Sequence, residues 1–341
     1  KTEILENNNV MIDDQFIGKI NGLKLELDLK KGALETDIKS LKKAARQSIG
    51  PELEKRIQII VDTGLVELND DFKIYWNNFS IAKLSVGNDY LNPKFELVVD
   101  ETIEQNQKQK LTDFINKWLH NKINTVLKSL IDLKNLKEKN SSIKALAYQL
   151  YENNGVLKRE QVSSYLKSLG QNERKILREL GVKFGRYHVF LYQLIKPEAV
   201  SLRTLLWKNF HQKYYNLKPP TFGLNFLDDK DSKNKDFMLL CGFEKFDSLF
   251  VRIDILERLF MQIINSDSKE NKQIKMIPEM LNLLGCSKDN FKKLLKKMGY
   301  KIFDKENETF FKYSPMKNFK KDSIKKISSE NPFKILKNLN L

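Results

Sequence analysis

The sequence predicts an α+β fold that is predominantly helical and consists of several units with small β-hairpins. Three observations support this prediction. Long stretches repeat apolar residues at spacings of three and four, and short aromatic and β-branched runs lie between Asn, Asp and Gly pairs. Gly and Pro stand where these elements would end or begin. At 341 residues the chain is long enough for two or three domains.

The first hundred residues are expected to form a linker followed by a small helix-plus-sheet domain. Residues 1–14 are polar and typical of a linker, and the domain spans residues 15–103. Alternating runs on both sides of Asn21-Gly22 predict a β-hairpin. The further strands expected in this domain are Leu65–Leu68, Phe72–Trp76, Phe79–Val86 and Phe95–Val99.

Helices are predicted before and after these strands. Gly50-Pro51 interrupts an amphipathic stretch, so two helices are expected between residues 37 and 62. A helical domain is predicted over residues 104–226, and its first helix has one continuous apolar stripe from about 104 to 135. Shorter helices follow at about 143–153, 159–169 and 172–180.

The segment Arg174–Phe210 is the most informative part of the helical domain. A helix ends at Gly181, an apolar and aromatic strand follows, and Pro197 begins a second amphipathic helix. Four of the nine arginines lie in this segment, interleaved with aromatic residues. These residues are Arg174, Arg178, Arg186 and Arg203, with Tyr187, His188, Phe190 and Tyr192.

The C-terminal third is expected to hold a linker at 227–236, a winged-helix-like domain at 237–314 and a basic tail at 315–341. Two helices, a tight turn and a hairpin form the sequence outline of a winged helix. Leu177–Lys183 and Leu295–Lys301 both end a helix in Gly and enter an apolar strand, which suggests an internal duplication. The helices and strands in question are Ile277–Leu284, Lys288–Met298, Tyr300–Phe303 and Thr309–Tyr313.

The formal net charge of +16 favours an anionic partner, and nucleic acid is the commonest. Lysine makes up 51 of the 60 basic residues, a skew that an AT-rich genome would also produce. The arginines are therefore more informative, and seven of the nine lie between Arg159 and Arg258. Each could contact phosphate, or it could form a buried structural interaction.

The residues give no catalytic signature. The chain has no phosphate-binding loop, no nucleophile elbow and no zinc-binding motif, and its acidic clusters fall at turn positions. Two cysteines and three scattered histidines predict neither a disulfide framework nor a metal site. No apolar run is long enough to cross a bilayer and the first residues do not look like a signal peptide, so we expect a soluble, cytoplasmic protein without membrane contact.

Several segments, in the same order, resemble the C-terminal region of bacterial, chiefly alphaproteobacterial, superfamily-two DExH-type RNA helicases, which are related to the mitochondrial RNA-degradosome helicase. They are Lys73–Val86, Asn92–Asp100, Gly155–Gln161, Leu180–Trp207, Cys241–Leu259, Leu284–Tyr300 and Asn331–Leu341. The family's motor domains are not in this chain, so the resemblance implies a piece that lies downstream of a motor. It also implies ATP and magnesium for the parent protein and the motor domains as a partner in cis.

The leading hypothesis is an accessory region that holds single-stranded RNA for the motor. The predicted backbone contacts are Arg174, Arg178, Lys183 and Arg186, with Tyr187 exposed beside them and Val189 and Phe190 buried. A second basic patch is predicted on one helix, at Lys292, Lys293, Lys296 and Lys297. Two alternatives remain open: a winged-helix regulator that binds DNA, and a scaffold that contacts an exoribonuclease or the motor domains without touching nucleic acid.

Overall fold

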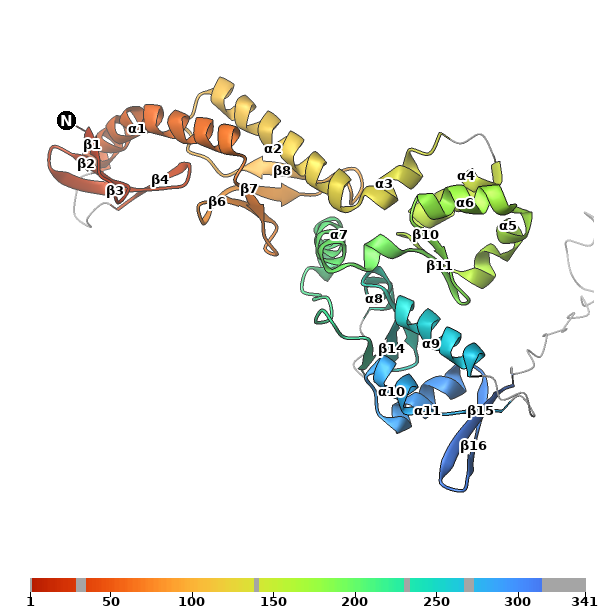
Figure 1. The fold of residues 1–341 in the computed structure, drawn as a ribbon. Helices are drawn as coiled ribbons and strands as arrows, with labels where there is room; N and C mark the ends of the chain where they lie inside the picture. The colour runs from red at the N-terminus through yellow and green to blue at the C-terminus, as the bar shows by residue number, and fades with distance from the viewer. Residues whose placement is uncertain (1, 29–34, 138–140, 230–233, 267–272, 315–341) are drawn as a thin grey trace, which may run out of the picture. The chain divides into compact units, whose positions relative to one another are not determined.

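The computed structural model describes residues 2–28, 35–137, 141–229, 234–266 and 273–314. The chain divides into two compact units, one comprising Lys1–Met261 with Leu283–Gly285, the other Gln262–Asn282 with Cys286–Leu341. Of the described residues, about 49% lie in helices and about 24% in strands, and the strands form five small antiparallel sheets (Figure 1). The α+β prediction is therefore confirmed. The predicted basic tail at 315–341 lies outside the described residues.

The first sheet has the strand order β1-β2-β3-β4. The hairpin at Asn21-Gly22 is present, and Gly22 has φ of +60°, as such a turn requires. Residues 1–14, expected as a linker, instead contain two of the strands. Among the residues of that segment whose burial is described, only Val10 is fully buried, so its apolar pattern is too weak to reveal them. The strands are Thr2–Ile4, Asn9–Ile12, Gln15–Asn21 and Lys24–Leu27.

A single helix, α1 (Glu35–Thr63), replaces the two helices expected around Gly50-Pro51. The buried residues of its described side chains recur at spacings of three and four straight through that pair. Packing of this stripe therefore outweighs the backbone hydrogen bond that Pro51 removes. The buried apolar residues are Ala45, Ile49, Leu53, Ile57 and Ile60.

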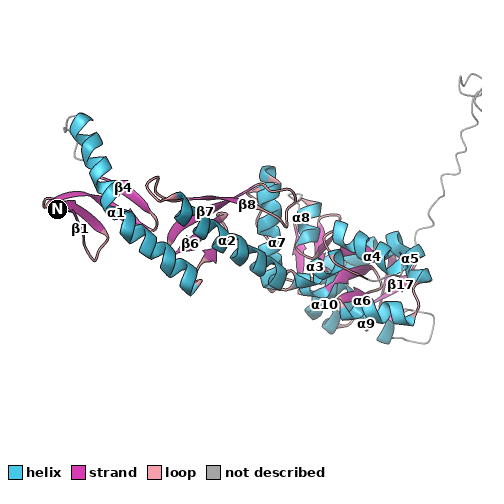
Figure 2. Ribbon diagram, turned by 90° about the horizontal axis from the view of Figure 1, so that it is seen from above, coloured by secondary structure: helices cyan, strands magenta, loops and turns pink. Residues whose placement is uncertain are grey.

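The second sheet, β5-β6-β7-β8, confirms the four predicted strands. It packs in one hydrophobic core with α2 (Gln105–Val126) and α3 (Lys128–Lys134), and α2 lies along it in both views (Figures 1 and 2). The expected single helix over 104–135 is interrupted at Leu127, whose ψ of 26° leaves the helical range. The strands are Glu67–Leu68, Lys73–Trp76, Phe79–Ser85 and Lys94–Leu97.

The remaining three sheets share one arrangement, in which the third strand of each sheet lies between the first and the second. In each, a helix ends at a glycine that leads into the second strand: Gly181, Gly242 and Gly299, with φ of +91°, +86° and +90°. This left-handed conformation suits glycine at a helix end. The similarity between Leu177–Lys183 and Leu295–Lys301 is thus part of a structural repeat that occurs three times, once for each of these sheets.

The first repeat contains the beginning of the Arg174–Phe210 segment, up to residue 191. Its elements are β9 (Val156–Lys158), η1 (Arg159–Val162), α5 (Ser163–Ser168), α6 (Gln171–Glu179), β10 (Val182–Phe184) and β11 (His188–Leu191). They follow α4 (Ser141–Glu152) and lead through η2 (Tyr192–Ile195) into α7 (Pro197–Phe210) and η3 (Gln212–Tyr214).

The second repeat begins where a linker was expected, at 227–236. There β12 pairs with β14, so residues 226–228 belong to a sheet. The aromatic side chains of Phe237 and Phe250 pack with Trp207 of α7 in one buried cluster, which explains why the boundary between compact units lies after Met261. The elements are β12 (Phe226–Asp228), α8 (Lys235–Leu240), β13 (Phe243–Phe246), β14 (Leu249–Arg252) and α9 (Ile253–Asn265).

The third repeat contains the predicted helices and hairpin, which are thereby confirmed. Its hairpin turn, Glu306-Asn307, has φ of +47° and +65°, and Phe291 and Phe311 meet edge to face in its core at 6.4 Å. The elements are β15 (Ile274–Lys275), α10 (Pro278–Leu284), α11 (Lys288–Lys297), β16 (Tyr300–Lys305) and β17 (Glu308–Tyr313).

Candidate nucleic-acid interface

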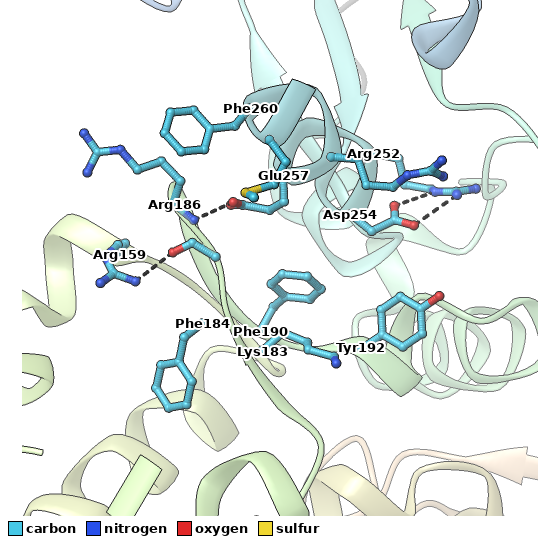
Figure 3. Close-up of a pocket in the computed structure, with 13 residues that line it drawn as sticks. Arg159, Lys183, Phe184, Arg186, Phe190, Tyr192, Arg252, Asp254, Glu257 and Phe260 are labelled. Atoms are coloured by element: carbon cyan, nitrogen blue, oxygen red, sulfur yellow. Dashed lines mark hydrogen bonds and ion pairs between the residues drawn. The ribbon is translucent and has the colours of Figure 1, made fainter. Parts of the chain in front are cut away.

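The turn between β10 and β11, Gly185-Arg186-Tyr187, is the centre of the candidate site (Figure 3). Arg159 fixes it from one side. Its backbone N–H donates to the Tyr187 carbonyl at 2.8 Å, and its Nη1 donates to the Gly185 carbonyl at 2.7 Å. The tip of this hairpin is therefore held in one place by an arginine that follows β9 directly.

Glu257 of α9 fixes the same turn from the other side. Its carboxylate accepts the backbone N–H groups of Arg186, Tyr187 and His188 at 2.5, 2.8 and 2.9 Å. A Cβ on Gly185 would lie 2.3 Å from the Glu257 carboxyl carbon, so any larger residue here would force the carboxylate to move away from the turn. A single carboxylate thus satisfies three successive backbone donors and joins the hairpin to α9.

His188 lies beneath this turn in a nearly closed cluster and is only 2% exposed. Its Nε2 is 2.8 Å from a carboxylate oxygen of Glu244, and its Nδ1 is 3.6 Å from Glu257. Burial acts to lower the pKa of His188, but its interactions with the two glutamates outweigh burial and raise it. Burial likewise acts to raise the pKa of Glu244 and of Glu257, but the contact with His188 lowers both.

The cluster predicts a definite dependence of stability on pH. A raised histidine pKa contributes stability below the ordinary value of 6.5, and this is lost as pH rises through the folded pKa. Lowered glutamate pKa values contribute stability above 4.5, which is lost as pH falls through their folded pKa values. In His188→Gln, thermal unfolding should show the largest loss in Tm between these two pH values. A loss that grows steadily from pH 6 to 9 would contradict the assignment.

The four side chains predicted to contact the RNA backbone all lie against aromatic rings. The guanidinium carbons of Arg174 and Arg178 are 5.8 and 5.6 Å from the ring centre of Phe184. The guanidinium carbon of Arg186 is 5.5 Å from the ring centre of Phe260, and the Lys183 ammonium is 6.0 Å from the ring centre of Tyr192. We call Arg174, Arg178, Lys183 and Arg186, with these rings, the basic–aromatic surface. Its cations are oriented by cation–π contacts instead of by carboxylates.

The members of this surface differ in exposure. Arg178, Lys183 and Arg186 are exposed, whereas Arg174 is half-buried. Arg174 donates to the carbonyls of Leu166 and Leu169 at 2.6 and 3.3 Å, which also gives it a structural role.

The aromatic residues of the segment are placed as follows. Tyr187, expected to be exposed, is half-buried because its ring packs edge to face on Phe260 at 5.4 Å. The prediction that Val189 and Phe190 are buried is confirmed, at 0% and 3% exposure. Tyr192 is 42% exposed, so one aromatic ring of the segment remains open to solvent.

A cavity of about 660 Å³ lies between the β10–β11 hairpin and α9 (Figure 3). Five of its lining residues are cationic and two are acidic, and aromatic rings make up much of the rest. We call this cavity the hairpin pocket. Its lining residues are Arg159, Lys183, Phe184, Gly185, Arg186, Phe190, Tyr192, Arg252, Asp254, Glu257, Arg258, Phe260 and Met261.

The second predicted patch lies on α11, in the other compact unit. The helix buries Phe291, Leu294 and Leu295 and turns its lysines outward, as expected. Lys292 forms an ion pair with Asp304 at 3.0 Å and is thereby partly neutralised. The remaining lysines of the patch, Lys293, Lys296 and Lys297, are exposed.

Sequence reasoning missed the side of the pocket that comes from α9. Glu257 lies 71 positions from Arg186, and no spacing rule links two such distant residues. One signal was available, since a glycine inside a strand-like run often marks a close approach of another group. Gly185 stands in such a run, within Phe184-Gly185-Arg186.

The described ranges contain neither a membrane-spanning helix nor a metal-binding cluster. No helix in this part of the chain is long and apolar enough to span a membrane. The described residues also contain no group of His, Cys, Asp and Glu side chains that could hold a metal ion.

The chain was compared with protein-family models, with curated proteins and with solved structures, and none of the three comparisons finds a match.

Proposed function

We propose that this chain is the accessory, nucleic-acid-binding C-terminal region of an ATP-dependent RNA helicase and that it holds single-stranded RNA for the motor domains. The observation that carries the proposal is the basic–aromatic surface, where Arg178, Lys183 and Arg186 are exposed next to aromatic rings. The resemblance to the helicase C-terminal region supplies the link to a motor. ATP and magnesium belong to that motor in this proposal, and the present chain contributes binding.

The chemistry of a single strand fits this surface. Guanidinium groups pair with phosphate through two parallel hydrogen bonds, and aromatic faces accept unstacked bases of any sequence. No ion pair joins Arg178, Lys183 or Arg186 to a carboxylate within the described part of the chain. Their charge is therefore available to phosphate groups, which supports binding without sequence specificity.

A double variant tests the proposal. Arg178→Ala/Arg186→Ala should bind a random single-stranded RNA more weakly than the wild type in fluorescence anisotropy, because two phosphate contacts are removed. The matched control is Lys55→Ala/Lys94→Ala, which removes the same charge from two exposed lysines outside this surface. The control should bind nearly as well as the wild type. Equal affinity of both variants would favour the scaffold hypothesis, in which the charge reflects genome composition.

A second candidate function is a winged-helix regulator that binds duplex DNA. The observation that favours it is the third repeat, where α10 and α11 precede the β16–β17 hairpin and α11 turns its lysines outward. Competition separates the two candidates. Displacement of a bound single-stranded RNA by random single strands supports the helicase proposal, and displacement by one duplex sequence in preference to others supports the regulator.

A further inference from the structure

The charges that line the hairpin pocket do not cancel. Asp254 is bound to Arg252 through two contacts, at 2.7 and 3.1 Å. Glu257 is occupied by three backbone N–H groups and by its proximity to His188. Both acidic groups of the lining thus have partners within the protein. The pocket retains a net positive charge and is suited to an anionic ligand.

Three cations of the lining have no carboxylate partner among the described residues. Lys183 and Arg186 belong to β10 and its turn, and Arg258 belongs to α9. Arg258 is exposed, as are the other two. The unpaired charge therefore comes from both elements that enclose the pocket, so an anionic group at the pocket could be contacted from either side.

The interior of the pocket is aromatic. Phe190 is 3% exposed, and it lines the pocket with Phe184 and Phe260. Tyr192 and Met261, at 42% and 54% exposed, add an aromatic ring and a flexible apolar side chain. The volume of about 660 Å³ lies in the range of roughly 300–1,000 Å³ typical of small-molecule sites. Apolar ring faces next to unpaired cations match a planar base attached to phosphate.

We propose that the hairpin pocket binds one unstacked nucleotide of a single-stranded RNA, with the base among the aromatic side chains and the adjoining phosphates on Lys183, Arg186 and Arg258. This inference rests on the proposed function and specifies where a base is held. A base that is stacked and paired in a duplex cannot enter such a pocket, so the site selects single strands.

Base dependence of binding tests the inference. The wild-type chain is titrated with an oligouridine and with an oligonucleotide of equal length that keeps the phosphates but lacks all bases. Stacking of one base contributes about 1–3 kcal/mol, so the base-containing strand should bind roughly 5- to 150-fold more tightly. In Tyr192→Ala this ratio should fall. Tyr148→Ala is the matched control, because Tyr148 is a 60% exposed tyrosine of α4 that does not line the pocket.

A second measurement locates the base without a variant. Oligouridine that carries 4-thiouridine is crosslinked to the wild-type chain by light, and the modified peptides are mapped. Crosslinks within Lys183–Tyr192 or Arg252–Met261, together with the selective fall in base dependence, support the inference. Crosslinks only elsewhere, with the same ratio in Tyr192→Ala as in the wild type, overturn the pocket assignment while RNA binding itself stands. A wild-type chain that binds neither strand overturns both the pocket and the proposed function.

Discussion

Replacing Arg203 with Met is expected to destabilise the chain by about 3–6 kcal/mol, a large part of the 5–15 kcal/mol that stabilises a typical domain. Arg203 of α7 is 0% exposed and donates to the carbonyls of Asn154, Leu194 and Leu240. These carbonyls come from three separate segments, and burial lowers the pKa of the guanidinium. Without the donor, the buried carbonyls of Leu194 and Leu240 are left unsatisfied at about 1–3 kcal/mol apiece, and the part-buried carbonyl of Asn154 loses a smaller amount. Urea unfolding measures the loss.

Two further variants make this measurement specific. Arg178→Met removes an exposed arginine from α6 and should change stability by no more than about 0.5 kcal/mol. Arg203→Lys retains the charge but lacks the fork of donors, so an intermediate loss is expected. If Arg203→Met were as stable as Arg178→Met, the three carbonyl contacts would not contribute to the fold.

Glu257→Ala is expected to weaken RNA binding although it makes the chain more positive by one charge. Charge alone would strengthen binding to a polyanion. We expect the opposite, because three backbone N–H groups lose their acceptor and the turn that carries Arg186 is no longer fixed to α9. Stability should also fall by about 2–4 kcal/mol, since water can replace the carboxylate only in part. Anisotropy and urea unfolding measure the two effects.

Glu179→Ala provides the control for this second prediction. Glu179 is an exposed residue of α6 next to the basic–aromatic surface, and its removal changes the net charge by the same amount. Its variant should bind RNA as well as the wild type or slightly better. Stronger binding by both glutamate variants would mean that net charge, and not the order of the hairpin, determines affinity.

Much of the fold could be predicted from local patterns. Turn pairs such as Asn21-Gly22 and helix-ending glycines such as Gly181 act through backbone conformation, which depends on the residue itself. The failures arose where distant contacts decide. α1 continues through Pro51 because its apolar stripe packs along its length, and β2 forms because it pairs with β3, which in turn gives β1 a strand to pair with.

The candidate site shows the same limit. Sequence reasoning selected Arg178 and Arg186 as contacts and left Arg203 out, but it gave no sign that Arg203 is entirely buried. α7 is buried on nearly all sides, so a polar residue on it has no solvent-facing stripe to occupy. Glu257 is also invisible to local patterns, because its contacts depend on the packing of α9 against a turn far away in the sequence.

The salt dependence of RNA binding tests the central claim most directly. Each phosphate contact to a single strand contributes a slope of about 0.7 in a plot of log affinity against log salt concentration. Arg178→Ala/Arg186→Ala should therefore reduce the slope of the wild-type chain by about 1.4, while Lys55→Ala/Lys94→Ala leaves it nearly unchanged. An Arg178→Ala/Arg186→Ala variant with the wild-type slope and affinity would contradict the account.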